Sequence, residues 1–325
     1  MAFPFFKRKK RKHLFTAAFY NLENLFDTED DSFSLDDDFT PEGAKKWSNK
    51  RYKRKLSKLS KTIDQLGRKE SALPPALVGV AEVENKRVVQ ELLQCGPLKK
   101  IPYDYIHFDS PDERGIDTAL IYHKEHFKPL FSEPIPLFIE NKEGERDMTR
   151  DILYVYGMLN GEAVHLFVNH WPSRRAGEEL TSSKRLSAAD TIISYMSGLE
   201  KEHEQLNYIV MGDFNDGPED RSIKHLVESK DLYNPMEKLI TPDRGSANYK
   251  RSWSLFDQII VSHSFFDFKK GTHSFAHANI FDEYFLTEWK GKYRGNPFRT
   301  YVGRKYKGGY SDHFPVYIQL KLNTP

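Results

Sequence analysis

Short apolar runs that end in polar residues recur along the whole 325-residue chain, and they restrict its fold more than any other feature. Each run is rich in Val, Ile, Leu, Phe or Tyr and is bounded by turn-forming residues, which is the pattern of a buried strand. The strands predicted in this way cover residues 13–21, 76–83, 103–108, 117–122, 152–159, 163–170, 208–214, 255–261 and 314–322.

Helical periodicity appears between these runs, at residues 50–66, 86–95, 182–202 and 221–228. Strands interleaved with helices predict sheets covered by helices, and we expect one α/β domain over residues 13–323. A basic arm, residues 1–12, precedes this domain. Two charged stretches are expected to be loops: residues 27–38, with seven acidic side chains in twelve, and the aromatic and basic segment 284–309.

Charge and cysteine content exclude several classes of protein. The formal net charge is only +2, so any binding of a polyanion must come from a local patch. Cys95 is the only cysteine, which excludes an intrachain disulfide and a zinc site built on several thiolates. The apolar stretch after the basic arm is too short for a signal peptide, and no run approaches a membrane span. We therefore expect a cytoplasmic monomer without stable membrane insertion.

The clearest chemical signal lies where residues 209–216 read I-V-M-G-D-F-N-D. Alternation along a strand places Asp213 and Asn215 on the same face. A carboxylate beside a carboxamide suits a hard cation or a water that attacks phosphorus. The alternative is an ordinary turn, because Gly, Asp and Asn all favour turns.

Four further segments place polar residues at the ends of apolar runs. They contribute Asn21, Glu82, His170 with Arg174 and Arg175, and Asp312 with His313, while Asp257 begins another run. Strand ends and the loops after them are where α/β proteins build sites. Each residue taken alone has a structural alternative: a turn Asp, a histidine satisfied at a sheet edge, or, for the Glu82 segment, a helix start capped by Asn85.

Taken together in chain order, these segments resemble the endonuclease/exonuclease/phosphatase superfamily. The resemblance rests on an early Asn, a Glu after a strand, an N-H segment, G-D-F-N, D-Q-I-I-V and S-D-H-F-P-V, and it spans residues 19–320. It implies a four-layer α/β sandwich, in which two mixed β-sheets pack face to face with helices outside.

The resemblance also implies roles for single residues. Glu82 is expected to be the main ligand of Mg²⁺ or Mn²⁺, with Asn21 and Asp312 completing the metal site. Asp213 is expected to orient or deprotonate the attacking water, and Asn215 to bind phosphate.

The two histidines are expected on opposite sides of the scissile phosphate. His313, held by Asp257, would donate to a phosphoryl oxygen. His170 would protonate the leaving oxygen, with Asp117 as the candidate that orients it.

Selection of the substrate is expected to depend on the rim of the site. Arg150, Arg174 and Arg175 are candidate phosphate ligands. A second set of rim candidates comes from segment 284–309 and comprises Lys290, Lys292, Arg294, Arg299, Arg304, Lys305 and Lys307, with Trp289, Tyr293, Phe298, Tyr301 and Tyr306 between them.

Aromatic and basic residues in alternation are typical of single-strand binders, so a nuclease acting on DNA or RNA is the favoured function. Residues 253–258 and 81–85 differ from the segments typical of inositol-polyphosphate phosphatases and abasic-site endonucleases, and Gln258 stands where the family usually has Arg. The alternatives are a phosphatase or lipid phosphodiesterase of the same superfamily, or a binding protein without catalysis.

Overall fold

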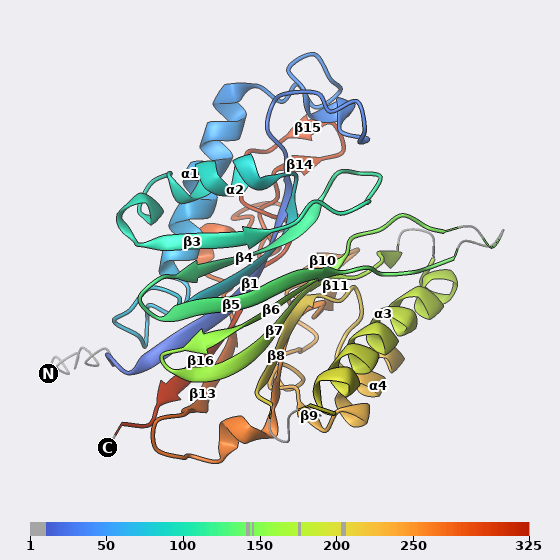
Figure 1. Cartoon of the computed structure of the whole chain (residues 1–325). Helices are drawn as coiled ribbons and strands as arrows, with labels where there is room; N and C mark the ends of the chain where they lie inside the picture. Colours follow the sequence, from blue (N-terminus) through green and yellow to red (C-terminus); the bar gives the residue numbers. More distant parts are fainter. Residues whose placement is uncertain (1–10, 141–143, 145, 175–176, 203–205, 325) are drawn as a thin grey trace, which may run out of the picture.

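Every apolar run predicted to be a strand forms one, and the strands build two six-stranded β-sheets (Figure 1). This computed structural model describes residues 11–140, 144, 146–174, 177–202 and 206–324. The predicted basic arm therefore lies outside the described residues except for Arg11 and Lys12.

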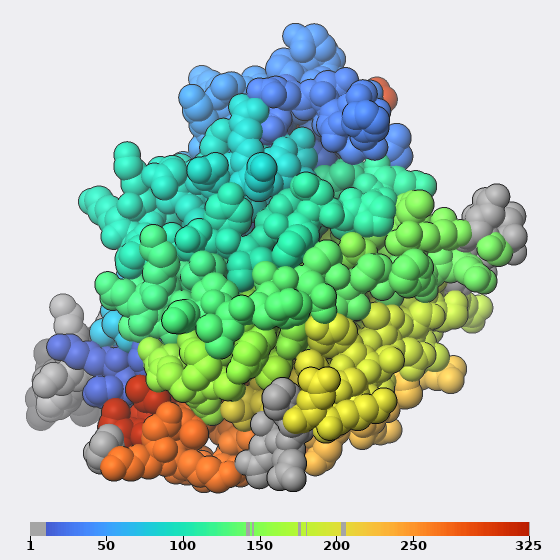
Figure 2. Space-filling view, in the orientation of Figure 1, coloured from blue at the N-terminus to red at the C-terminus, as the bar shows by residue number. Residues whose placement is uncertain are grey.

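The first sheet has the strand order β13-β16-β1-β2-β4-β3. Its strands are β1 (Leu14–Leu25), β2 (Leu77–Val83), β3 (Tyr103–His107), β4 (Asp117–His123), β13 (His273–Ile280) and β16 (Val316–Leu322). The dark blue end of β1 lies beside the red of β16 in the space-filling view, which reflects their antiparallel pairing (Figure 2).

The second sheet has the order β5-β6-β7-β8-β12-β9. Its strands are β5 (Phe127–Ile135), β6 (Ile152–Leu159), β7 (Glu162–His170), β8 (Tyr208–Asp213), β9 (Leu232–Tyr233) and β12 (Asp257–Ser262). Two short hairpins stand apart from the sheets: β10 (Ala247–Tyr249) with β11 (Ser252–Ser254), and β14 (Tyr301–Val302) with β15 (Lys305–Tyr306).

Helices cover the outer face of each sheet, so the predicted four-layer sandwich of mixed sheets is confirmed (Figure 1). The helices are α1 (Asn49–Gln65), α2 (Lys86–Leu93), α3 (Glu178–Leu199) and α4 (Arg221–Ser229), with 3-10 turns η1 (Asp37–Phe39), η2 (Leu98–Lys100), η4 (His263–Phe266) and η5 (Tyr284–Leu286). In α1 the buried residues Tyr52, Leu56, Leu59 and Ile63 recur every three or four positions and form one apolar face. Asn85 caps α2 by accepting a hydrogen bond from Val88 N at 3.1 Å.

Two long strands were missing from the prediction, and both lie at sheet edges. β5 contains Pro129 and Pro134, and it exposes about half of Leu130 and Phe131. Proline is tolerated at a sheet edge, where one side of the strand makes no ladder hydrogen bonds. In the sequence alone, however, two prolines argue against predicting a strand. β13 carries His273, Ser274 and His277 among its apolar residues, so its pattern resembled a polar loop.

The topology brings the ends of four strands to one place. Each sheet contains one parallel pair, β1 with β2 and β7 with β8, and a helix-containing connection joins the strands of each pair. All other neighbouring strands in the two sheets are antiparallel. No helix in the described part of the chain combines the length and apolar character needed to cross a membrane.

Gly79 in β2 faces the second sheet at a densely packed point. A Cβ at this position would lie 2.6 Å from Met211 Sδ and 3.1 Å from side-chain atoms of Phe19 and Val168, all of them core residues. A larger side chain at this position would therefore displace its neighbours between the sheets.

We predict that Gly79→Val lowers the free energy of unfolding by about 1–3 kcal/mol, because overpacking of a dense core forces neighbouring side chains out of place. Gly198→Ala in α3 is the control, since no neighbouring heavy atom lies within 4 Å and alanine favours a helix. Urea denaturation measures both midpoints. An unchanged midpoint for Gly79→Val would show that the inter-sheet contact is looser than described.

Candidate active site

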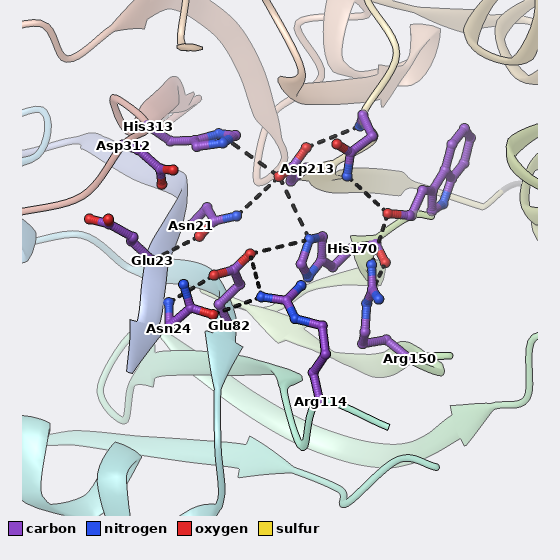
Figure 3. Close-up of polar contacts among 12 residues, drawn as sticks. Asn21, Glu23, Asn24, Glu82, Arg114, Arg150, His170, Asp213, Asp312 and His313 are labelled. Carbon is purple, nitrogen blue, oxygen red and sulfur yellow. Dashed lines mark hydrogen bonds and ion pairs between the residues drawn. The ribbon is translucent and has the colours of Figure 1, made fainter. Parts of the chain in front are cut away.

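The predicted site residues meet at one edge of the sandwich because of the strand directions. Asn21, Glu82, His170 and Asp213 lie at the carboxyl ends of β1, β2, β7 and β8, the four strands of the two parallel pairs. Since the sheets pack face to face, these side chains converge (Figure 3).

Two antiparallel strands begin at the same edge. Asp257, the first residue of β12, lies opposite Asp213 in the sheet register. His313 precedes β16, and its Nδ1 contacts Asp257 Oδ2 at 2.7 Å. The predicted contact between this histidine and its carboxylate is therefore present.

Asp213 is the centre of the polar network. Its Oδ2 accepts a hydrogen bond from Asn21 Nδ2 at 3.0 Å, and His170 Nε2 and His313 Nδ1 each lie 3.8 Å from the same oxygen. The two histidine nitrogens therefore lie within twice that distance of each other, inside the about 10 Å expected if they share one phosphate.

The charges of these groups follow from their burial and their neighbours. Burial, with a further contribution from Asp257, raises the pKa of Asp213 to about 6, although His313 and Asn21 oppose the shift. Burial opposes the protonated form of His313, yet Asp257 and Asp213 outweigh it and raise the pKa of His313 well above its usual value. The imidazolium is thus stabilised, and the adjacent carboxylate is a stronger base than a free Asp.

Asn215 links the ends of β7 and β8. Its backbone N–H donates to Asp213 Oδ1 at 3.0 Å, and its Nδ2 donates to Trp171 O at 2.9 Å. The predicted phosphate-binding amide therefore has a positioning role in this structure, because it holds Asp213 and the end of β7.

Glu82 lies on the other side of His170. Its Oε1 is 3.8 Å from His170 Nε2, and its Oε2 accepts a hydrogen bond from Asn24 N at 2.8 Å. Arg114 Nη2 lies 3.8 Å from Glu82 Oε1 and donates to Asn24 Oδ1 at 2.7 Å (Figure 3). Sequence analysis missed Arg114, although it lies only three residues before Asp117, which was a candidate site residue.

The side chain of Arg150 is buried, and it joins two segments of the chain. Its guanidinium contacts Asp112 Oδ2 at 2.8 Å, Trp171 O at 3.0 Å and His170 O at 3.3 Å. Asp112 in turn accepts from Arg114 N at 3.1 Å. Arg150 therefore joins the end of β7 to the loop that carries Arg114, while its predicted contact with substrate phosphate stays a prediction.

Arg174 is likewise occupied by acidic partners. It forms ion pairs with Asp216, Asp220 and Glu178, and it donates to Asn215 O at 2.7 Å. These carboxylates balance its charge, and its role as a phosphate ligand stays a prediction. Arg175 lies outside the described residues.

Asp117 has a partner other than the predicted His170. Its Oδ2 contacts His107 Nε2 at 3.1 Å, and its Oδ1 accepts from Ser110 N at 3.0 Å and from Ser110 Oγ. The reason is local, because β3 and β4 are neighbouring antiparallel strands and His107 ends β3 where Asp117 begins β4. Asp117 thus stabilises the start of β4.

A charge network behind Asp312, buried at Glu23 and Lys55 and partly exposed at Arg299, was also missed. Asp312 Oδ2 accepts from Arg299 Nη2 at 2.7 Å, and Arg299 Nε lies 3.5 Å from Glu23 Oε1. Burial and the nearby Asp312 raise the pKa of Glu23 to about 7. Burial also disfavours the charged form of Asp312, but His313, Arg299 and Lys55 outweigh this effect and lower the pKa of Asp312. Contacts between residues so far apart in sequence leave no local pattern.

Lys55 of α1 fixes this network from the other side. Its fully buried Nζ donates to Glu23 O and, at 2.7 Å, to Thr300 Oγ1, while the Glu23 carboxylate accepts from Thr300 N. The first strand, the first helix and the segment before β14 are therefore joined next to the site.

Four non-glycine residues at the site have left-handed backbone conformations. The φ angles are 52° at Glu23 and Asn24, 61° at Glu82 and 51° at Asn215. Such conformations cost energy for residues other than glycine and cluster at functional sites. They also aim the side chains of consecutive residues in directions that a regular strand does not allow.

Comparison with known proteins agrees with this geometry. The model of the Endonuclease/Exonuclease/phosphatase family matches residues 16–322. An endonuclease/exonuclease/phosphatase family protein from Bacteroides thetaiotaomicron is 18% identical, with 97% of each chain covered and a TM-score of 0.59.

Two other solved structures share the fold. A mannosyl-6-phosphatase from the same bacterium is 18% identical over 94% of this chain and 99% of its own, with a TM-score of 0.58. TDP2 from D. rerio, complexed with a single-strand DNA product, is 15% identical over 95% and 100%, with a TM-score of 0.57. Among curated proteins, no sequence matches this chain.

We predict that Arg150→Ala lowers the free energy of unfolding by about 3–5 kcal/mol, because it leaves the Asp112 carboxylate buried without its partner. Arg114→Ala should cost less than about 1 kcal/mol, since the Arg114 side chain is 27% exposed. Urea denaturation compares the two variants. Full stability of Arg150→Ala together with weaker substrate binding would contradict the stabilising role and support the predicted contact of Arg150 with phosphate.

Proposed function

The chain belongs to the endonuclease/exonuclease/phosphatase family of hydrolytic phosphoesterases, and on that basis we propose that it is a metal-dependent nuclease. The observation that carries this proposal is the position of His170 Nε2 and His313 Nδ1, each 3.8 Å from the same oxygen of Asp213. Two imidazoles beside one buried carboxylate can serve opposite sides of a phosphodiester. We further propose that residues 13–323 act as one domain.

Glu82, Asp312 and Asn21 are the residues that would hold a divalent cation. They offer carboxylate and amide oxygens, and the described side chains around them include no thiol, so the donor set fits Mg²⁺ or Mn²⁺. Asn21 Oδ1 accepts from Glu23 N at 2.9 Å and retains a second lone pair. A bound cation would polarise a phosphoryl oxygen of the substrate.

Asp213 is the proposed base. Asn21 Nδ2 and Asn215 N hold its two oxygens, so its carboxylate is oriented before substrate binds. With its pKa raised to about 6, Asp213 remains largely ionised at neutral pH and accepts a proton from water more readily than a free Asp does.

The histidines would act on the oxygens of the phosphate. His313, kept protonated by Asp257 and Asp213, would donate to a non-bridging oxygen and stabilise the charge that develops there. His170 lies between Glu82 and Asp213 and would deliver a proton to the leaving oxygen.

Arg114 is a further proposed phosphate ligand, in addition to the candidates Arg150 and Arg174. Its Nη2 lies beside Glu82 and Asn24, and the Arg150–Asp112 ion pair holds its loop against the end of β7. A guanidinium can bind two phosphate oxygens at once, which would orient the ester before attack.

Nucleic acid is the proposed substrate because a related fold, D. rerio TDP2, has been solved with a single-strand DNA product. The mannosyl-6-phosphatase of the same fold makes a phosphomonoesterase the second candidate. A substrate panel separates them. Fast release of phosphate from a small monoester, with no cleavage of plasmid DNA, single-stranded DNA or RNA in Mg²⁺ or Mn²⁺, would replace the nuclease by the phosphatase.

We predict that chelation by EDTA abolishes cleavage and that Glu82→Gln raises the Mg²⁺ concentration needed for half-maximal rate. Loss of an outer-shell partner of a metal ligand lowers metal affinity by about 10- to 100-fold, so the loss of a direct ligand should raise the required Mg²⁺ concentration by at least this factor. Glu84→Gln is the matched control. Burial and the neighbouring Asp27, Asp36 and Asp31 raise the pKa of Glu84 to about 8, so glutamine resembles its form at neutral pH. Full activity of Glu82→Gln at limiting Mg²⁺ would refute the metal assignment.

We predict that Arg114→Ala lowers kcat/KM for the preferred substrate by about 10²–10³, the usual cost of removing one donor to the transition state. Arg114→Lys should recover only part of this loss, because an ammonium lacks the planar fork. The control is Arg68→Ala, which removes a similarly exposed arginine at the end of α1. Equal kinetics for the two alanine variants would exclude Arg114 from the site.

A further inference from the structure

Two exposed loop tips stand beside His313. The β10–β11 hairpin is attached there by an antiparallel bridge between Ala247 and His313 and by a hydrogen bond of 2.7 Å from Phe314 N to Ser246 O. Trp253 of β11 stacks on Phe314, with ring centroids 5.9 Å apart. The hairpin is thus held firmly at its base, and only its tip projects.

The second tip belongs to residues 287–297. Glu288 and Asn296 close it through backbone hydrogen bonds of 2.8 Å, Glu288 N to Asn296 O and Gly295 N to Glu288 O. Asn296 Nδ2 donates to Asn248 Oδ1 of β10 at 3.1 Å and so joins the two tips. We call residues 249–251 and 289–294 together the tip surface.

The tip surface combines aromatic rings with cations and has no carboxylate. Its rings are 72% exposed at Tyr249, 59% at Trp289 and 48% at Tyr293. Its cations, all exposed, are Lys250, Arg251, Lys290, Lys292 and Arg294. Each of its three lysines lies over the face of a neighbouring ring, with Nζ 5.1 Å from the ring centroid for Lys250 and Tyr249, 5.1 Å for Lys290 and Trp289, and 4.8 Å for Lys292 and Tyr293.

Several other rim candidates in segment 284–309 already have partners or are buried, so the available rim is narrower than predicted from sequence, although Arg304 and Lys305 are exposed. Arg299 pairs with Asp312, and Lys307 lies 3.1 Å from Glu288. Tyr306 lies under Arg51 of α1, and Tyr301 is buried. In Figure 1 the β14–β15 hairpin accordingly lies beside α1, away from β10 and β11.

We propose that the tip surface binds single-stranded nucleic acid and guides it to the catalytic histidines, an inference that rests on the proposed nuclease function. Unpaired bases would stack on Tyr249, Trp289 and Tyr293, and the adjacent lysines would contact the phosphates. Bases in a duplex are already stacked on each other and offer no such faces.

The composition of the tips favours this partner over a membrane. A surface that enters a lipid interface buries an apolar face of residues such as Trp, Phe and Leu, and of these the tip surface has Trp289 alone. The tip surface has no aliphatic or Phe side chain, and a lysine accompanies each of its three rings.

The test uses the full chain with Tyr249, Trp289 and Tyr293 all changed to Ala. The first measurement is fluorescence anisotropy of a labelled 20-nucleotide oligothymidylate in EDTA, which reports binding without cleavage. The second is hydrolysis of bis(p-nitrophenyl) phosphate in Mg²⁺ or Mn²⁺, a diester too small to reach the tips. Phe131→Ala with Phe268→Ala is the matched control, since both rings are exposed and lie elsewhere.

We expect the triple variant to bind the oligonucleotide at least about tenfold more weakly, because stacking of a single base on one ring accounts for that much. Its rate on the small diester should equal that of the unaltered protein. Changing Lys250, Lys290 and Lys292 to Gln should reduce the slope of log K against log salt by about 2, as expected when about three phosphate contacts are lost.

Two results would overturn the proposal: unchanged oligonucleotide binding by the triple variant, or equal losses in the control. Loss of binding to phosphatidylserine vesicles with unchanged oligonucleotide binding would assign the tip surface to membranes instead. Failure of the proposed nuclease function is distinguishable from failure of this proposal. In the first case the unaltered protein would not hydrolyse the small diester, while the anisotropy measurement would still show whether the tip surface binds the oligonucleotide.

Discussion

The buried carboxylate of Asp213 is the group on which the organisation of the site depends. A charge removed from water is stable only with partners, and here they come from both sheets: Asn21 from β1, His170 from β7 and His313 before β16. The sheets must therefore stack in the one arrangement that satisfies this oxygen. The same requirement that builds the site also contributes to fixing how the two layers pack.

The sequence predicted the strands from local patterns and the four-layer fold from a family resemblance, and the same patterns indicated which polar residues would meet. An apolar run ending in Asp, His or Glu is visible in sequence, and chain direction then brings Asn21, Glu82, His170 and Asp213 to one edge. The edge strands β5 and β13 were missed because their prolines and histidines suit a strand with one free side. The network of Lys55, Glu23 and Thr300 was missed because its members are up to 277 residues apart.

The arginines show what reasoning from sequence leaves out. Arg150 and Arg174 were predicted as candidate phosphate ligands, and in the structure each is paired with carboxylates. Arg114, beside Glu82, had no basic neighbour to draw attention to it. The availability of a positive charge depends on which acids fold against it, and only the three-dimensional structure supplies that information.

The position of β1 has a consequence for synthesis. In the first sheet β1 lies between β2 and β16, and the register joins Leu14 to Lys321, so the first strand is completed by the last. A ribosome releases the chain from its N-terminus, and until residues 312–322 emerge, β1 has an open edge and Asp213 lacks His313. The growing polypeptide therefore cannot complete the polar network around Asp213 until its last strand has emerged.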